Sequence, residues 1–396
     1  MAIDFSNWNG SGKPACILQI IPALNAGGAE RGCIDIAMAV AAAGGRSIVV
    51  SEGGRMVTRL ENGDAEHLVM PMASKNPVVM LRNTRRLSQL IRETGAGLVH
   101  ARSRAPAWSA IKAAHATGVP FITTFHGLYG GQNAAKLAYN RVMVEGEHVI
   151  AVSRFIADHI QSTYDISTDK ITTIPRGINL DHFNPDNVSH IRKIQLLKAW
   201  GIEDHPKQII LMPGRMTRWK GQSDLIEVAG ILRKKRDDFL CVLPGDDVGH
   251  LGFRQEIETA IEAKNLGAHV LIPGHLNDIS AAYALSDLVV SASIEPEAFG
   301  RVPVEAQAMR RPVIAYGHGG ALETVVDGMT GFLVPPGDVK ALAAGLDTLL
   351  ELNLDARLQI GAQGRAHVEE NYRLEDMCAA TLGVYQRLLS PQDIVV

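Results

Sequence analysis

The sequence predicts an α/β protein with two domains, each built on a parallel β-sheet. Short apolar, β-branched runs alternate with longer amphipathic stretches along most of the chain. Strand–helix alternation with strands this apolar is typical of parallel sheets that are buried on both faces. The length of 396 residues supports two domains, because a single core rarely grows beyond about 250–300 residues.

The first half of the chain supplies the first domain, which we expect to span 1–185. The alternation stops over 176–207, a polar stretch with a basic helix around 189–199. Before this break we expect strands at 16–21, 46–51, 67–71, 97–101, 120–125, 148–153 and 171–175, with helices at 28–43, 77–94, 104–117 and 133–146.

The alternation then restarts, which predicts a second α/β domain over 186–373 rather than a continuation of the first. A last amphipathic helix, about 374–390, follows the completed second domain and can pack back on the first. Strands are expected at 208–213, 239–244, 269–273, 287–293, 311–316 and 331–336.

The charge balance excludes a nucleic-acid coat protein, because 39 basic and 42 acidic residues give a net charge of −3. Residues 75–115 nevertheless carry a net charge of +7. The helix at 77–94 places Arg82, Arg85 and Arg86 on one face, which can lie on an anionic membrane surface or be simply solvated. The four dispersed cysteines predict neither a disulfide framework nor a zinc site and fit a cytoplasmic protein, which can lie at the inner face of a membrane.

Two basic residues follow the first strand of the second domain. Arg215 and Lys220 flank a turn that opens a helix. Ligands of parallel sheets bind at the carboxyl ends of strands, and cations beside a helix N-terminus favour a diphosphate. The alternative is a solvated turn with surface charges.

Two glutamates follow the strand at 287–293. Glu297 is predicted to lie in the loop at the strand end, and Glu305 about one turn into the next helix. Carboxylates accept paired hydrogen bonds from vicinal hydroxyls, and a helix start attracts phosphate. A sugar nucleotide presents both groups, whereas two ordinary glutamates near a helix N-terminus are the alternative.

Three strand ends of the first domain also carry candidate ligand-binding residues. Gly28 lies where the first strand turns into the first helix, but the G-x-G-x-x-G fingerprint of a dinucleotide-binding dehydrogenase is absent. His126 follows the strand at 120–125 and points toward a cleft in this architecture. His100 lies at the end of the strand at 97–101, and Arg102 and Arg104 follow it; these three residues can meet an anionic acceptor, unless the arginines are surface charges.

The second domain resembles the nucleotide-sugar domain of retaining glycosyltransferases of family 4, the group 1 glycosyltransferases. The resemblance covers most of 208–340 and consists of GRMTRWKGQ, PGD at 244–246, PGH at 273–275, EPEAFGRVPVEAQAM, PVIA, GGALETV and DGMTGFLVPPGD, in that order. It implies the GT-B fold, in which two Rossmann-like domains with parallel sheets face each other across a central cleft.

The resemblance also implies roles for individual residues. Arg215, Lys220 and Gly28 would bind the donor diphosphate, and Glu297 and His126 would contact the transferred sugar as the catalytic pair. Phe299 and Gly300, which lie between the two glutamates, would line the donor sugar, and Glu305 would bind the ribose. Pro273 and His275 would line the base pocket.

Two departures from the family pattern limit this transfer of roles. IPRGIN places Arg176 and Asn179 where Asn and Asp are common, so no contact near Arg176 is carried over, and EAQAM replaces EAMA. No D-x-D triplet occurs, so we expect neither a metal ion nor another cofactor.

The sequence therefore predicts a retaining hexosyltransferase that uses a UDP- or GDP-sugar. The expected acceptor is a lipid-linked or polysaccharide glycan of the cell envelope, such as lipopolysaccharide or a glycolipid. The alternatives are a GT-B nucleotide-sugar epimerase and a non-catalytic sugar-nucleotide binding protein. A glycosidase is rejected, because Glu297 and Glu305 are assigned to different sugars rather than to the two sides of one scissile bond.

Overall fold

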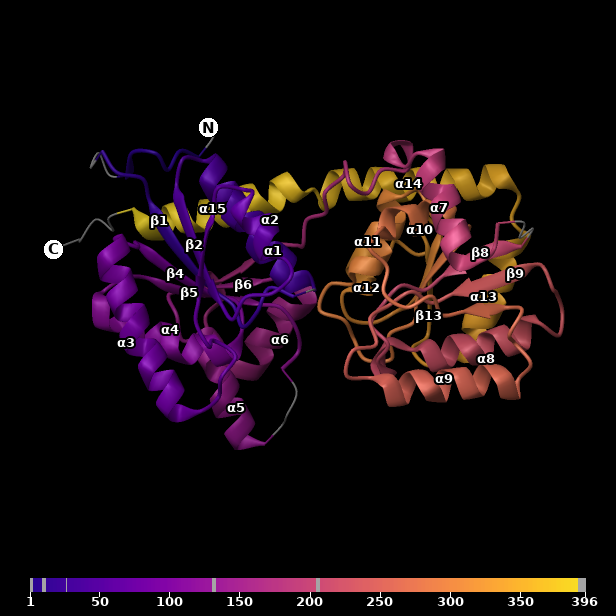
Figure 1. Ribbon diagram of the computed structural model, residues 1–396, viewed down its shortest axis with the longest axis horizontal. Helices are drawn as coiled ribbons and strands as arrows, with labels where there is room; N and C mark the ends of the chain where they lie inside the picture. Colours follow the sequence, from indigo (N-terminus) through magenta and orange to yellow (C-terminus); the bar gives the residue numbers. More distant parts are fainter. Residues whose placement is uncertain (1–2, 9–11, 26, 130–132, 204–206, 391–396) are drawn as a thin grey trace. The chain divides into compact units, whose positions relative to one another are not determined.

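The computed structural model describes residues 3–8, 12–25, 27–129, 133–203 and 207–390 (Figure 1). The chain divides into two compact units. One comprises Met1–Gly177 together with Leu374–Val396, and the other comprises Ile178–Arg373. The division thus falls between Gly177 and Ile178, whereas the sequence places it after residue 185.

The first unit is built on a seven-stranded parallel sheet with the order β3-β2-β1-β4-β5-β6-β7. The order reverses between β1 and β4, and such a switch point is where open α/β sheets bind ligands. Leu18 in β1 lies opposite Ile48 of β2 on one side and Val99 of β4 on the other. The strands are β1 (Cys16–Ile20), β2 (Arg46–Ser51), β3 (Glu66–Val69), β4 (Leu98–Ala101), β5 (Phe121–Phe125), β6 (His148–Ala151) and β7 (Ile171–Thr173).

The helices of this unit begin and end at residues that suit helix termini. Asn76 accepts a hydrogen bond from the Val78 amide ahead of α3, and Gly95 ends that helix with φ 67°. The predicted helix at 133–146 ends earlier, at Arg141, and a 3₁₀ turn follows over Val142–Val144. There the Thr123 hydroxyl of β5 donates to the Met143 carbonyl. The helices are α1 (Gly28–Ala42), α2 (Val57–Glu61), α3 (Pro77–Thr94), α4 (Arg104–Thr117), α5 (Ala134–Arg141) and α6 (Arg154–Tyr164).

The last helix, α15 (Leu374–Leu389), belongs to the first unit although it follows the second in sequence. It lies beside the first sheet (yellow in Figure 1) and contacts α1 and β4. Tyr385 of α15 is fully buried in one apolar cluster with Ile17 of β1 and Leu98 of β4. The C-terminal helix therefore completes the core of the first unit.

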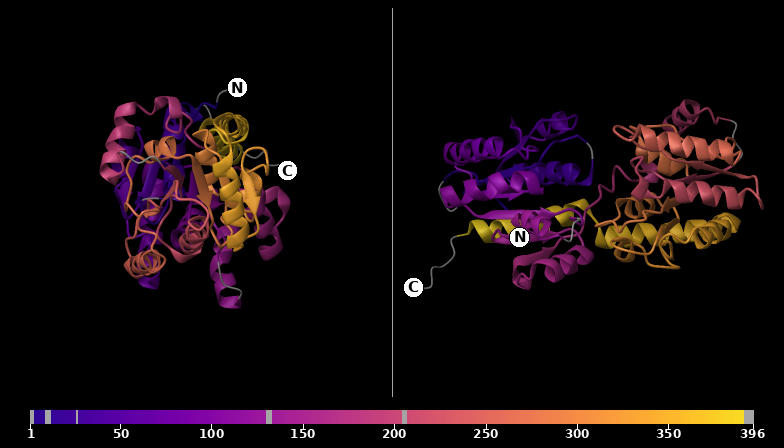
Figure 2. Two further views of the ribbon diagram at one scale, coloured as in Figure 1. Left: turned by 90° about the vertical axis from the view of Figure 1, so that its right-hand side faces the viewer. Right: turned by 90° about the horizontal axis from the view of Figure 1, so that it is seen from below.

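The second unit repeats the design with a six-stranded parallel sheet of the order β10-β9-β8-β11-β12-β13. Seen from below, helices lie on both sides of the strands of each sheet (Figure 2, right). The switch point here lies between β8 and β11. The strands are β8 (Gln208–Leu211), β9 (Phe239–Val242), β10 (Val270–Leu271), β11 (Leu288–Ser291), β12 (Val313–Tyr316) and β13 (Phe332–Val334).

Eight helices of the described chain cover this second sheet or lead into it. The core between α8, α13 and the strands is apolar, with Leu225, Leu346 and Ile314 among its fully buried residues. The helices are α7 (His190–Trp200), α8 (Gln222–Leu232), α9 (Leu251–Ala263), α10 (Ile279–Leu285), α11 (Arg301–Ala308), α12 (Ala321–Thr324), α13 (Val339–Glu351) and α14 (Leu354–Asn371).

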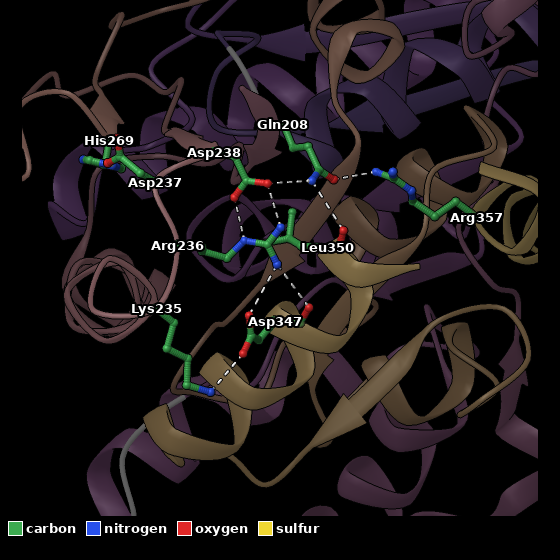
Figure 3. Close-up of polar contacts among 9 residues, drawn as sticks. All are labelled: Gln208, Lys235, Arg236, Asp237, Asp238, His269, Asp347, Leu350 and Arg357. Atoms are coloured by element: carbon green, nitrogen blue, oxygen red, sulfur yellow. Dashed lines mark hydrogen bonds and ion pairs between the residues drawn. The ribbon is translucent and has the colours of Figure 1, made fainter. Parts of the chain in front are cut away.

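A polar network closes the amino-terminal edge of the second sheet (Figure 3). Arg236 donates two hydrogen bonds to Asp238, just before β9, and also contacts Asp347 of α13. The paired guanidinium lowers the pKa of Asp238 to about 2. Arg357 of α14 donates to the Gln208 side chain at the start of β8. These contacts anchor α13 and α14 to the sheet at the edge opposite the carboxyl ends of the strands.

Candidate active site

A lysine–glutamate pair lies at the switch point of the second sheet. Lys220 ends a short 3₁₀ turn after β8, and its Nζ lies 2.8 Å from Oε1 of Glu297, which follows β11. Both side chains are largely buried, with 15% and 18% of their surfaces exposed. The Ser293 hydroxyl also donates to Glu297 Oε1. The structure thus brings together the proposed diphosphate-binding cation and the proposed sugar-binding carboxylate.

Glycines let the loops around this pair approach one another closely. A side chain on Gly221 would overlap the carbonyl of Ala292, and Gly221 has φ 81°. Gly320 lies against Phe299 and donates its amide to the Glu297 carbonyl at 2.8 Å. Two small cavities of about 10 Å³ each have Ser291, Ser293 and Glu297 in their linings. The glycines therefore position the Glu297 loop beside β8.

Glu305 is buried, and each oxygen of its carboxylate accepts a hydrogen bond from another side chain. Oε2 accepts from the Tyr283 hydroxyl at 3.0 Å, and Oε1 accepts from Arg301 Nη2 at 3.0 Å. Arg301 is the first residue of α11 and lies one turn before Glu305. These contacts fix the orientation of the carboxylate predicted to bind a ribose.

The remaining predicted donor-site residues occupy loops at the same edge of the sheet. Arg215 is exposed in the loop after β8, while Pro273 is half-buried and His275 exposed after β10. Phe299 is buried, with its ring 5.4 Å from that of Tyr372, so its side chain packs inside the unit. Gly300 caps α11 with φ 79°. Among the residues that the structure describes, no group of three or more His, Cys, Asp or Glu side chains is arranged to hold a metal ion.

The first unit joins Gly28 and His126 through a residue that the sequence analysis left without a role. Arg176, three residues after β7, donates one hydrogen bond to the Gly28 carbonyl and a second, at 2.7 Å, to His126 Nδ1. Arg176 is itself only 7% exposed. A side chain on Gly32 would overlap the Arg176 guanidinium, so this glycine makes room for the arginine.

Burial and the hydrogen bond from Arg176 together determine the protonation of His126. Burial, reinforced by the adjacent Arg176 guanidinium, holds the pKa of His126 well below its usual range, so the ring is neutral at pH 7. Because an arginine N–H can only donate, Nδ1 must accept, which assigns the ring proton to Nε2. His126 Nε2 is buried and has no hydrogen-bond partner among the described residues. His126 therefore offers a hydrogen-bond donor.

The three predicted acceptor-side residues have different surroundings. His100 is fully buried, with Nδ1 2.6 Å from the Tyr385 hydroxyl and Nε2 2.7 Å from the Thr124 hydroxyl. Its position therefore supports a structural role rather than the predicted contact with an acceptor. Arg102 is 5% exposed and bonds Gln19 within the unit. Arg104 alone of the three is partly exposed.

Sequence reasoning missed four residues of these sites. Ser293, Tyr283 and Arg301 bond the two glutamates, but hydroxyls and a helical arginine are common and carry no distinctive spacing. Arg176 carried a usable signal, because it directly follows the predicted strand at 171–175 and ligands of parallel sheets bind at the carboxyl ends of strands. The family pattern assigns it no role, because Asn is common at this position.

Comparisons with known proteins relate both units of this chain to glycosyltransferases. Residues 196–367 match the family described as glycosyl transferases group 1, and residues 26–182 match glycosyltransferase family 4. A crystal structure of a glycosyltransferase from Rickettsia africae ESF-5 superimposes with a TM-score of 0.87 and 39% identity, covering 96% of this chain and 99% of the other.

Two further proteins show the breadth of the likeness. HepE of Anabaena, solved in complex with UDP and glucose, superimposes with a TM-score of 0.84 at 23% identity, over 94% of this chain and all of that chain. A D-inositol 3-phosphate glycosyltransferase of Frankia alni is 29% identical over 72% of this chain and 73% of its own length.

The chain belongs to the group 1 glycosyltransferases of family 4 and has the GT-B fold. It is thus a transferase of a class that uses nucleotide sugars. The predictions of the family, the fold class and a glycosyltransferase activity are confirmed.

Proposed function

We propose that this glycosyltransferase moves a hexose from a UDP- or GDP-sugar to a lipid-linked or polysaccharide acceptor, with retention of configuration. The observation that carries the proposal is the Lys220–Glu297 pair at the switch point of the second sheet. Lys220 and the exposed Arg215 supply positive charge for the diphosphate, and Glu297 supplies acceptor oxygens for sugar hydroxyls. The crystal structure of HepE with UDP and glucose supports this type of donor.

The proposed reaction breaks the bond between the anomeric carbon and the leaving diphosphate and forms a bond from the acceptor oxygen on the same face. The proton of the acceptor hydroxyl passes to an oxygen of the departing phosphate. Lys220 and Arg215 stabilise the negative charge that develops on the diphosphate. Because these cations are part of the protein, we propose that the reaction needs no metal ion. The neutral His126 donates a hydrogen bond to the donor sugar through Nε2.

Binding of the donor is the first test of this proposal. A panel of UDP-, GDP- and ADP-sugars should contain at least one compound that raises the melting temperature by a few degrees, because a ligand that binds only the folded protein stabilises it. The measurement is a thermal shift at ligand concentrations well above the dissociation constant. The absence of a shift with all three classes would contradict the proposal, and conversion of the donor without an acceptor would indicate an epimerase.

We further propose that the enzyme works at the inner face of a cell membrane, in lipopolysaccharide or glycolipid synthesis, through its basic segment 75–115. On α3, Val78 and Leu81 are 76% and 54% exposed beside the exposed Arg82, Arg85 and Arg86. Apolar side chains next to cations favour contact with anionic lipid. Within the described residues, no helix is both long and apolar enough to cross a bilayer.

Co-sedimentation with vesicles tests the membrane contact. The protein should bind phosphatidylglycerol vesicles and not phosphatidylcholine vesicles, since each basic residue near an anionic surface adds about 1 kcal/mol. Replacing Arg82, Arg85 and Arg86 with glutamine should remove most of the binding. The matched control replaces Lys193, Lys198 and Lys234 of the second unit with glutamine. Equal loss in both variants would show a bulk charge effect and contradict a contact through α3.

A further inference from the structure

A cavity of about 490 Å³ lies at the switch point of the first sheet. Its lining includes Pro22, which follows β1, and Ser103, which follows β4. These are the neighbouring strands between which the strand order reverses. Its volume falls within the range of small-molecule sites. All residues of its lining come from the first unit, whereas the donor pair Lys220–Glu297 belongs to the second.

The lining of the cavity is positively charged. Lys75 precedes α3, Arg104 begins α4, and Lys136 lies in the first turn of α5, so the three cations come from three separate segments of the first unit. In the part of the chain that the structure describes, no carboxylate lines the cavity, and none of these three cations forms an ion pair. Three like charges without a counterion create a potential that attracts an anion.

The groups around the cavity are also arranged to donate hydrogen bonds. Arg104 is held in place by Asn140, which accepts from its Nη1 at 2.9 Å, and by the Tyr129 ring, whose centroid lies 4.3 Å from the guanidinium carbon. The Tyr139 hydroxyl is buried, and the described residues offer it no hydrogen-bond partner. Ser103 precedes α4 without making a capping hydrogen bond from its side chain. A ligand rich in oxygen atoms would satisfy these groups.

We propose that this cavity binds a phosphate group carried by the acceptor, either on a soluble sugar or at a lipid headgroup. A phosphate monoester carries about −1.5 to −2 charges at pH 7 and three strong acceptor oxygens, which suits three cations better than a single carboxylate does. The cavity thereby selects phosphorylated acceptors. Identifying the ligand as the acceptor rests on the proposed glycosyltransferase function, but the binding of phosphate does not.

Calorimetric titration of the full-length protein tests the site. The donor site is first saturated with UDP or GDP, whichever binds, so that phosphate probes cannot occupy the diphosphate position. The probes are glucose, glucose 6-phosphate, dihexanoylphosphatidate and inorganic phosphate. We expect at least one phosphorylated organic probe to bind more than tenfold more tightly than glucose. Lys75→Ala and Lys136→Ala should each weaken that binding about tenfold, the effect of one charge-assisted hydrogen bond.

Lys170→Ala is the matched control, because Lys170 is an exposed lysine of the same unit at the amino end of β7. It should bind every probe as the wild type does. The site is overturned if Lys75→Ala and Lys136→Ala bind the phosphorylated probes with unchanged affinity. It is also overturned if inorganic phosphate binds as tightly as the organic probes, which would indicate an adventitious ion only. If no nucleotide binds but the lysine-dependent phosphate binding persists, the result supports the phosphate site in the cavity and contradicts the proposed function.

Discussion

Replacing Lys220 with alanine should lower kcat/KM for sugar transfer by about 10²–10³-fold, the usual effect of removing one preorganised charge from a transition state. Lys220 is the largely buried cation next to Glu297, and its loss removes positive charge where the diphosphate departs. We expect the donor KM to rise and kcat to fall together, because the diphosphate is bound in the ground state as well. Steady-state kinetics with the donor found in the thermal-shift panel measure both.

Glu297→Ala should lower kcat to a similar extent with a smaller change in the donor KM. Its carboxylate is assigned to the sugar, and its removal frees Lys220 from an ion pair that competes with the diphosphate. The matched control for both variants is Arg218→Ala. Arg218 lies in the same turn but is 68% exposed and pairs with Glu256 on the surface, so activity should change less than twofold. Wild-type turnover in both Lys220→Ala and Glu297→Ala would refute the site.

Strand positions could be predicted from the sequence because burial on both faces leaves runs of apolar, β-branched residues that loops do not contain. The ends of the runs are less informative. The run 208–213 extends two residues past β8, which ends at Leu211. Met212 continues the apolar pattern of the sequence, whereas the strand itself cannot continue through Pro213, which has no N–H for a sheet hydrogen bond. The apolar runs thus locate each strand, and backbone hydrogen bonding determines the residue at which the strand ends.

The candidate site was less predictable, since its contacts depend on strand order. Lys220 and Glu297 each follow a strand, but they are 77 residues apart. They meet because β8 and β11 are neighbours, which no local pattern records. His100 shows a second limit of local patterns. It ends a strand as a ligand-binding residue would, but Tyr385, 285 residues later, covers it from α15. The sequence around His100 could not predict that a helix distant in the chain buries this side chain.

Arg176 should prove to be a positioning residue for His126, although the family pattern has no arginine there. Arg176→Ala removes the hydrogen bond to His126 Nδ1 and a positive charge that lowers the pKa of the ring. The ring is then free to place its proton on either nitrogen, and its pKa rises toward the usual value. We expect kcat to fall about 10- to 100-fold, the range known for loss of the hydrogen-bond partner of a metal-binding histidine.

Two measurements distinguish positioning from a general loss of structure. The nitrogen chemical shifts of His126 should report a single Nε2–H tautomer in the wild type and a mixture in Arg176→Ala. Because the pKa of the wild-type ring lies well below its usual range, kcat should not follow His126 ionisation near pH 6.5 in the wild type. In the variant, the pKa of His126 should be higher. As the pH is lowered, the ring should therefore become protonated, and activity should be lost, at a higher pH than in the wild type.

Gly32→Ala provides an independent variant with both Arg176 and His126 intact. The added Cβ overlaps the Arg176 guanidinium and must displace it, so the kinetics and the tautomer mixture should resemble those of Arg176→Ala. Arg176→Lys keeps the positive charge but changes the shape of the hydrogen-bond donor. Its pH profile should therefore lie between those of Arg176→Ala and the wild type. If Arg176→Ala lowers kcat while His126 keeps its Nε2–H signature and its low pKa, Arg176 does not act by holding the proton of His126 on Nε2. That result would contradict its role as a positioning residue.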